Sequence, residues 1–346
     1  MEIRIVSKIE EFQALQSTWV SLFNSDEYSV FQSFEFNYYS WEFELSKNAL
    51  HHLCIVLLKN RSDIFAILPL YIDAKKRLRF INDDHADFCD FISKEEVSLL
   101  KVYNYLKLKL NFKSVRFRNI KHKSNLYISA VQLNMENKVV KSISEYSSVN
   151  LEEGSFPYNV KHYRSHQKHR INKASRKYQD SNSVIFSSNE HHFPKKEILL
   201  LRDKMIDLGF RQYDFLTNER LCLIEHLYNS GFLILHVVKH KDKMNSCNII
   251  MRKSPVEFMF WIDLFDESKM INIFSYIRFM QFVSSRSSVA INFGRGRYFY
   301  KVSNFAPFFE KLYQIEIYHT KWDKLKAMII NYIIDLLAYF SKKITS

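Results

Sequence analysis

INFGRGRYFYK, residues 291–301, is the most informative stretch of the chain, because it holds two of only five glycines. Glycine permits positive φ angles and a close approach of the backbone to a ligand. The two glycines follow a predicted strand at 288–293, and Arg295, Arg297 and Lys301 place cations beside the turn. A phosphate or a developing negative charge can bind such groups. An ordinary turn at a strand end is the alternative interpretation, and the GxGxxG dinucleotide pattern is incomplete.

Upstream of this turn lies a strongly basic segment, YNVKHYRSHQKHRINKASRKY, residues 158–178, which carries seven lysines and arginines. We predict a helix here. A solvated helix face is one interpretation of such a charge run, and a surface for nucleic acid is another. The histidines of this helix have no carboxylate partner at zinc-type spacing, so we predict no metal site.

An acidic loop, DDHADFCD, residues 83–90, concentrates four carboxylates in a basic protein. It lacks the ligand spacing and the distal glutamate of a calcium loop. A solvated turn is one interpretation. Alternatively, one of its carboxylates accepts a proton from an amine nucleophile, since a general base needs hydrogen-bond reach and a suitable pKa.

Composition limits the classes of protein to which the chain can belong. Its 346 residues suffice for about two domains, and 50 Lys and Arg against 37 Asp and Glu give a net charge of +13. The charge favours an anionic partner, such as a phosphate-bearing ligand, an acidic membrane surface or nucleic acid; an AT-rich genome is an alternative origin for the lysines. Four dispersed cysteines and no apolar leader favour a reducing, cytoplasmic setting.

The order of predicted elements mixes strands and helices, which indicates an α/β or α+β fold. Residues 127–157 show little periodicity, and we place a domain boundary near residue 150. The longest apolar run, 327–340, is shorter than the roughly 20 residues that cross a bilayer. We therefore predict a helix that lies on the protein or, as an alternative, on a membrane face. No G-x-S-x-G elbow or Walker loop is present.

Taken together, these segments resemble known acyltransferases. FQSFEFNYYSW, AILPLYI, LRFINDDHADFCDF, the basic helix and INFGRGRYFYK are similar, in this order, to the CelD/BcsL-type branch of the GNAT superfamily. HRINKASRKY and YFYKVSNFAP are also similar to stretches of the Fem-type peptidoglycan aminoacyltransferases, which are built from two GNAT-like domains.

The resemblance implies two GNAT-like domains, each a mixed central sheet flanked by helices, at 1–150 and 151–320, followed by a C-terminal amphipathic helix at 321–346. It implies catalytic roles for two residues: Lys301 would stabilise charge during acyl transfer, and Asp87 is a candidate base. Six further residues would bind substrate: Arg170, Asn172, Asp90, Asn292, Arg295 and Tyr300. Of these, Arg170 would contact a phosphate of the acceptor. In the CelD-like pattern, Asn292 replaces the usual aspartate.

The resemblance also implies a co-substrate, acyl-CoA and in particular acetyl-CoA. Its phosphates would bind the backbone at Met270, Ile271 and Asn272, where a helix begins. The corresponding loop of typical GNAT enzymes contains glycine, and this one does not.

The leading functional prediction is an N-acyltransferase that moves an acyl group from acyl-CoA to an amine of a sugar-containing polysaccharide or lipid-linked envelope precursor. Peripheral contact with the inner membrane face would accompany it. A Fem-like transferase that uses aminoacyl-tRNA is an alternative, and this alternative alone requires nucleic acid. A non-catalytic module that binds an anionic glycan or nucleic acid is the third.

Overall fold

The computed structural model describes residues 1–24, 27–61, 63–240, 243–266 and 268–344, and it describes residues 269, 331 and 334–344 by their backbone alone. The chain forms two compact units. Unit 1 comprises Met1–Thr18, Asn48–Ile143 and Leu312–Ser346, and unit 2 comprises Trp19–Lys47 and Ser144–Lys311. Each unit therefore joins segments that are distant in sequence. The domain ranges 1–150, 151–320 and 321–346 stay predictions, and residues 345–346 lie outside the described chain.

Unit 1 is built on a mixed sheet. Its strands follow the order β1-β2-β3-β4-β6-β13, and β5 pairs with β3. The β4–β6 pair is parallel and the others are antiparallel. Their bounds are β1 (Glu2–Val6), β2 (His52–Asn60), β3 (Asp63–Ile72), β4 (Arg77–Phe80), β5 (Ile92–Ser93), β6 (Ser114–Lys121) and β13 (Phe308–Tyr318).

The helices of unit 1 cover this sheet with apolar side chains. Its core contains Val102 and Leu106 of α4 (Leu99–Lys109) and Ala130 of α5 (Asn125–Gln132), which meet residues of β3, β4, β6 and β13 around a small apolar cavity. The unit also contains α1 (Ile9–Gln13) and the C-terminal α11 (Lys321–Ile344), and α2 (Gln16–Leu22) spans the boundary at Thr18. Within the described residues, no helix has both the length and the apolar character required to cross a membrane.

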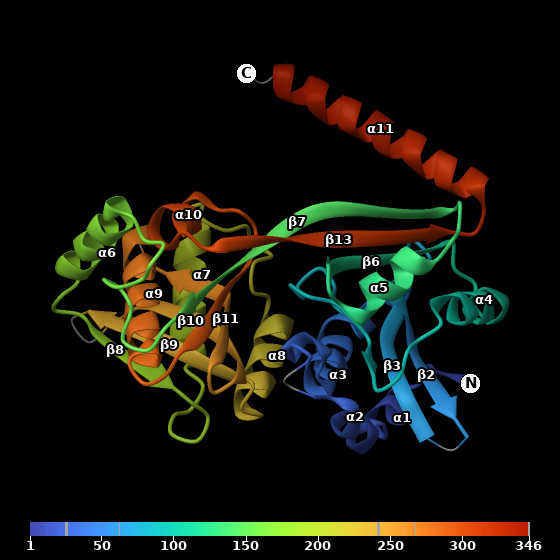
Figure 1. Ribbon diagram of the computed structural model, residues 1–346, viewed down its shortest axis with the longest axis horizontal. Coiled ribbons are helices and arrows are strands. Elements are labelled where there is room, and N and C mark those ends of the chain that lie inside the picture. Colours follow the sequence, from blue (N-terminus) through green and yellow to red (C-terminus); the bar gives the residue numbers. More distant parts are fainter. Residues whose placement is uncertain (25–26, 62, 241–242, 267, 345–346) are drawn as a thin grey trace. The chain divides into compact units, whose positions relative to one another are not determined.

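In unit 2 the strands follow the order β7-β12-β11-β10-β9-β8, and the first residues of β7 belong to unit 1. The β11–β12 pair is parallel, and the other pairs are antiparallel. The long α9 (Lys269–Ser284) packs against β9, β10 and β11 (Figure 1). The strands are β7 (Lys138–Leu151), β8 (Asn182–Phe186), β9 (Leu233–His240), β10 (Lys243–Ser254), β11 (Glu257–Phe265) and β12 (Val289–Arg295).

The remaining helices of unit 2 surround this arrangement. α6 (Ser165–Lys177) packs against α9 and α10 (Phe299–Phe305), α7 (Lys195–Asp207) packs against β10 and β11, and α3 (Phe34–Phe43) packs against α8 (Asn218–Asn229). Short 3-10 turns occupy Val30–Gln32 and Leu45–Lys47. The packing brings the basic helix and the glycine turn, more than 100 residues apart in sequence, to neighbouring positions.

The prediction of a mixed α/β chain is confirmed, and two local expectations change. Residues 127–157, whose sequence shows little periodicity, include most of α5 and the 14-residue strand β7. β7 is rich in serine and lysine, so it lacks the apolar alternation by which a half-buried strand is recognised. The basic helix expected over 158–178 begins only at Ser165, because residues 158–164 form turns and irregular structure.

Candidate active site

The glycine turn at the end of β12 is fixed by hydrogen bonds on both sides. The Gly294 amide donates to Asn292 Oδ1 at 2.8 Å, and the Gly296 amide donates to the Glu145 carbonyl at 2.7 Å. Both glycines have positive φ, +70° and +89°. A Cβ added at Gly296 would lie 2.5 Å from the Tyr298 ring. The turn therefore requires glycine, as the sequence indicated, and Asn292 supports the turn.

Lys301 lies beneath this turn and is only 1% exposed. Its Nζ donates to the Arg295 carbonyl at 2.8 Å and to the Gly294 and Gly296 carbonyls at 3.3 Å. An ammonium group has three donors, and three successive carbonyls accept from them. The geometry assigns Lys301 a positioning role in the turn, while its expected role in stabilising charge on a reacting group stays a prediction.

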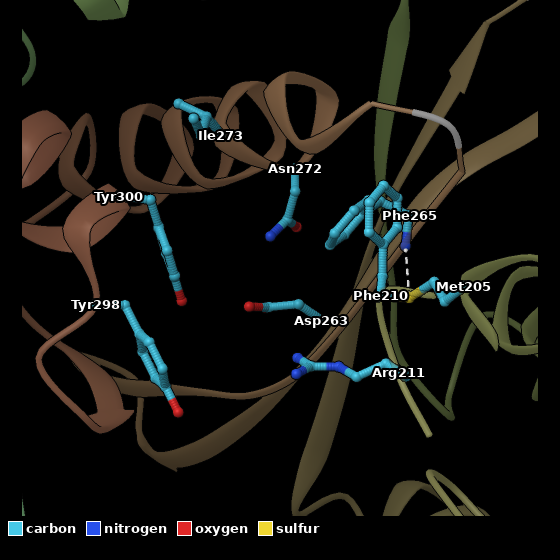
Figure 2. A pocket seen from close by; sticks show the side chains of 9 residues that line it. All are labelled: Met205, Phe210, Arg211, Asp263, Phe265, Asn272, Ile273, Tyr298 and Tyr300. Atoms are coloured by element: carbon cyan, nitrogen blue, oxygen red, sulfur yellow. Dashed lines mark hydrogen bonds between the residues drawn. The ribbon is translucent and has the colours of Figure 1, made fainter. Parts of the chain in front are cut away.

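A cavity of about 260 Å³ opens in unit 2 beside the turn. Figure 2 shows that the polar ends of Asp263, Asn272, Tyr300 and Arg211 converge on it. Apolar side chains complete the wall. The described lining residues are Met205, Phe210, Arg211, Asp263, Phe265, Asn272, Ile273, Tyr298 and Tyr300. Tyr300 and Asn272 are predicted site residues, and the cavity brings them together.

Asp263, on β11, is the acidic residue of this cavity. Its Oδ2 accepts from the Tyr276 hydroxyl at 2.6 Å, and its Oδ1 accepts from Asn248 Nδ2 at 3.0 Å. Burial raises the pKa of the Asp263 carboxyl, while the Tyr276 hydroxyl and the positive charges of Lys301 and Arg211 act in the opposite direction. The Tyr276 hydroxyl also lies 3.4 Å from the Tyr300 hydroxyl.

A buried polar chain extends from Asp263 into the core. Asn248 Nδ2 donates to Asn272 Oδ1 at 2.7 Å, and Asn248 Oδ1 accepts from the Ser275 hydroxyl. Ser275 in turn contacts His236 Nδ1 at 2.8 Å. Burial lowers the pKa of His236 to about 3, so the imidazole is neutral at physiological pH. The chain fixes the orientation of Asn248, which holds both Asp263 and Asn272.

The basic helix α6 contributes an exposed cation near the turn. The Arg170 guanidinium lies 5.4 Å from the centroid of the Phe299 ring, which is 75% exposed. Asn172 accepts a hydrogen bond from the Tyr158 hydroxyl at 3.0 Å. Arg295 is half-buried within the turn. Substrate binding by Arg170, Asn172, Asn292 and Arg295 stays a prediction, with all four residues in unit 2.

The first turn of α9 was expected to bind the phosphates of coenzyme A. Here the Met270 amide donates to Ser268 Oγ at 3.3 Å, and the Ile271 amide donates to the Ser268 carbonyl at 3.1 Å. Ser268 thus satisfies two of the amides on which the expectation rests. Asn272, by contrast, presents its side chain to the cavity. Cofactor binding by these three residues stays a prediction.

The acidic loop belongs to unit 1, whereas the residues described so far belong to unit 2. Arg79 forms ion pairs with Asp83 and with Asp84, the latter at 2.8 Å, and Arg118 also pairs with Asp84 at 2.8 Å. Asp87 is buried, with 8% of its surface exposed. Two of the four carboxylates therefore form a structural ion-pair cluster, and the role of Asp87 as a base stays a prediction.

Asp90 organises the start of α5. Its Oδ1 accepts from the amides of Phe91 and Leu126, and its Oδ2 accepts from the amide of Asn125, at 2.9, 3.1 and 3.2 Å. Such contacts satisfy amide groups that a helix leaves without internal partners. The sequence suggested substrate binding by Asp90; the contacts show a structural use of both oxygens.

Replacing Asp90 by alanine is therefore expected to lower the free energy of unfolding by about 1–2 kcal/mol, the usual cost of losing a helix cap. Urea denaturation measures the change. The matched control is Glu96→Ala at an exposed position of the same unit, which should change stability by less than about 0.5 kcal/mol. An increase in KM with unchanged stability would instead support the substrate-binding role.

Sequence reasoning missed the most informative group of the cavity, Asp263. The signal was present as FMFWIDLF, residues 258–265, where one carboxylate interrupts an apolar strand. A charge within a buried strand requires a specific partner or a function. Arg211 carried no comparable signal, because it lies in a turn after α7. Among the described residues, no group of three or more His, Cys, Asp or Glu side chains is arranged to hold a metal ion.

No family model matches the chain, and a search of the curated proteins finds no match. Solved structures do match. The C-terminal domain of an Agrobacterium fabrum protein, described as a lysylphosphatidylglycerol synthetase, has a TM-score of 0.58 at 11% identity over 93% of this chain and 96% of its own. FemX has a TM-score of 0.58 at 7% identity, with coverage of 91% and 97%. A tandem GNAT protein from the clavulanic acid biosynthesis pathway has a TM-score of 0.50 at 7% identity, with coverage of 91% and 98%.

These likenesses show the fold. The prediction of two GNAT-like domains with a C-terminal helix is confirmed, and so is the fold-level similarity to a Fem-type protein. The similarity to the CelD/BcsL-type branch stays a prediction. Activity, donor and acceptor are a separate question, because a shared fold does not determine function.

Proposed function

We propose that this chain is a transferase that moves an aminoacyl group from an activated donor to an acceptor, and that the cavity of unit 2 holds the aminoacyl part. The observation that carries the proposal is the Asp263 carboxyl in a cavity whose walls include Phe210, Phe265 and Ile273. A carboxylate in such surroundings favours cationic partners; Arg211 of the lining and Lys301 place positive charge near it, and a substrate cation can add a direct partner. The α-ammonium of an aminoacyl group supplies one, and an acetyl group does not.

The size of the cavity supports a small group. Its volume of about 260 Å³ lies below the roughly 300–1,000 Å³ typical of sites for drug-sized ligands. Tyr300 and Asn272 offer hydrogen bonds within it. Burial raises the pKa of the Tyr300 hydroxyl, which therefore stays protonated. In the proposal, this hydroxyl donates to the carbonyl oxygen of the ester that is attacked.

In the proposed reaction, an amine or hydroxyl of the acceptor attacks the aminoacyl ester carbonyl, and the ester oxygen of the donor leaves with a proton. The chain contributes orientation: Asp263 holds the ammonium, and Tyr300 holds the carbonyl. The net charge of +13 and the exposed cations of α6 support a polyanionic donor such as tRNA. An envelope or lipid-linked precursor is the proposed acceptor class. The Agrobacterium fabrum neighbour is described as a lysylphosphatidylglycerol synthetase, a name that contains both a lysyl group and a phospholipid, and this name favours the proposed acceptor class.

Binding of charged tRNA tests the proposal. A mixture of tRNAs charged with amino acids is compared with the same tRNAs after N-acetylation, which removes the positive charge of the amino group. We expect the free aminoacyl forms to bind about tenfold or more tightly, because hydrogen bonds to charged groups contribute about 1.5–3 kcal/mol. Equal affinity of the chain for both forms would contradict the proposal.

An acyl-CoA-dependent N-acyltransferase is the second candidate. It is favoured by the position of Asn272, which lies in the first turn of α9 and reaches the cavity, and by the fold of the tandem GNAT protein. Asp263 would then accept the proton of an amine acceptor. Two results would together favour this candidate over the first: acetyl-CoA displaces bound tRNA, and acetyl-CoA binds to the chain when no tRNA is present.

A further inference from the structure

The C-terminal helix α11 turns large apolar side chains away from the protein. Trp322, Met328, Ile329 and Tyr332 are 72%, 55%, 51% and 65% exposed. Side chains three and four residues apart lie on the same face of a helix. Trp322, Leu325, Ile329 and Tyr332 follow this spacing, so they form one outward apolar stripe.

The opposite face of α11 contacts other residues of unit 1 near the start of the helix. Lys324 Nζ donates to the carbonyls of Glu136 and Lys138 at 2.9 and 3.1 Å. Ala327 and Asp323 line a cavity together with residues of β6 and β13. In an ordinary surface helix the apolar stripe faces the core and the polar face meets water. In α11 the side chains of the apolar stripe are exposed instead, so the stripe lacks a protein partner among the described residues.

The cavity beside α11 is strongly basic. It has a volume of about 640 Å³, and its lining includes five cationic side chains: Lys75, Arg77, Lys113, Arg116 and Lys326. Glu316 and Asp323 are the carboxylates of the lining. Arg77 pairs with Asp73, and Arg116 pairs with Glu316. Lys75, Lys113 and Lys326 are exposed and have no ion pair with any residue that the structure describes. A surplus of positive charge therefore adjoins the apolar stripe.

We propose that α11 lies in the interfacial plane of an anionic bilayer, with its apolar stripe among the acyl chains and a lipid phosphate in the basic cavity. An apolar face flanked by lysines is typical of helices that bind membranes in plane. Tryptophan and tyrosine suit the boundary between acyl chains and headgroups. Charge complementarity favours this partner over a second copy of the chain, because two copies at +13 repel each other. The inference does not depend on the proposed reaction.

Vesicle sedimentation of the full chain tests the proposal. Vesicles of phosphatidylcholine alone are compared with an equimolar mixture of phosphatidylcholine and phosphatidylglycerol. We expect binding to the anionic vesicles, weakened roughly fivefold for each charge removed by Lys75→Gln and Lys113→Gln, since each basic residue near such a surface contributes about 1 kcal/mol. The double variant Leu325→Ser and Ile329→Ser should weaken binding at least about tenfold by removing apolar area.

Trp322 provides an independent signal. Of the four tryptophans, Trp19 and Trp41 are buried and Trp261 is half-buried, so the exposed Trp322 is expected to give a blue shift on vesicle binding that Trp322→Phe abolishes. The matched controls change exposed positions elsewhere: Leu108→Ser on α4 and Lys196→Gln on α7. Both should bind like the unchanged chain.

Two outcomes would overturn the proposal. One is that the chain does not bind vesicles, or that it binds both lipid compositions equally and the α11 variants bind like the unchanged chain. The other is a concentration-dependent dimer in analytical ultracentrifugation that the Leu325→Ser and Ile329→Ser variant abolishes, without vesicle binding by the unchanged chain. The second result would identify another copy of the chain as the partner of the stripe.

Discussion

Asp263→Asn is expected to lower kcat/KM for aminoacyl transfer by about ten- to a hundredfold, because hydrogen bonds to charged groups contribute about 1.5–3 kcal/mol. Asparagine has the shape of aspartate, so it leaves the volume of the cavity nearly unchanged. It removes the negative charge that we propose to hold the α-ammonium of the donor. Steady-state kinetics with charged tRNA as donor would measure the effect.

The same carboxyl gives the reaction a pH dependence. Burial raises the pKa of Asp263, so protonation begins at a higher pH than for an ordinary aspartate. Transfer by the unchanged chain should therefore fall as the pH decreases through this raised pKa. Asp263→Asn should lack this inflection in its residual rate.

The contribution of Asp263 to stability should depend on pH in the opposite direction to its contribution to activity. A raised pKa means that the folded chain binds this proton more tightly than the unfolded chain, so its contribution to stability is present at low pH and is lost as the pH rises. Asp263→Asn removes this loss and should be as stable as the unchanged chain, or more stable, at neutral pH. Asp203→Asn, at an exposed position on α7, is the control for both measurements. Full activity of Asp263→Asn would refute the role of the carboxylate.

The sequence predicted the glycine turn well, because the turn depends on local properties. Gly294 and Gly296 have the positive φ angles that glycine permits, and the strand before the turn follows from the residues next to it. The mixed α/β class was also predictable. What the local pattern did not contain was the direction of the Lys301 side chain, which points back to the carbonyls of its own turn.

The acidic loop shows the opposite case. Its four carboxylates are obvious in the sequence, but their use depends on contacts with distant strands and helices. Arg118 lies 34 residues after Asp84, its partner, and Leu126 donates to Asp90 from 36 residues away. Substrate binding by Asp90, which the resemblance implied, stays a prediction, and the fold shows that both oxygens of this carboxylate accept backbone amides, two of them at the start of α5.

The cavity was the least predictable feature, because its polar residues come from α7, β11, α9 and α10 and from the turns beside them. The Asn248–Asp263 contact depends on the register of β10 and β11, in which these two residues are paired. Strand register is a tertiary property that no short motif encodes. Of the described residues that line the cavity, Asn272 and Tyr300 alone were named from the sequence, and Figure 2 labels both.

Lys301→Met is expected to destabilise the turn and, with it, the cavity. The change removes the donors that three successive carbonyls share and leaves these carbonyls without an ammonium partner. We expect a decrease of about 3 kcal/mol in the stability of unit 2, since hydrogen bonds to charged groups contribute about 1.5–3 kcal/mol and unsatisfied buried groups add a cost. Hydrogen exchange should show faster exchange at the Gly294 and Gly296 amides, which are hydrogen-bonded in the native turn.

Kinetics separate positioning from direct catalysis. If Lys301 acts through the turn, Lys301→Met should raise KM as well as lower kcat, because Tyr298 and Tyr300 lose their fixed positions at the cavity. If its ammonium stabilises the oxyanion directly, kcat should fall with unchanged KM and with normal protection of the two amides. Lys311→Met, which changes an exposed lysine on β13, should alter none of these quantities. Hydrogen-exchange protection of the two glycine amides and KM change together only if Lys301 acts through the turn. The two measurements therefore decide whether the lysine supports the site or takes part in the reaction.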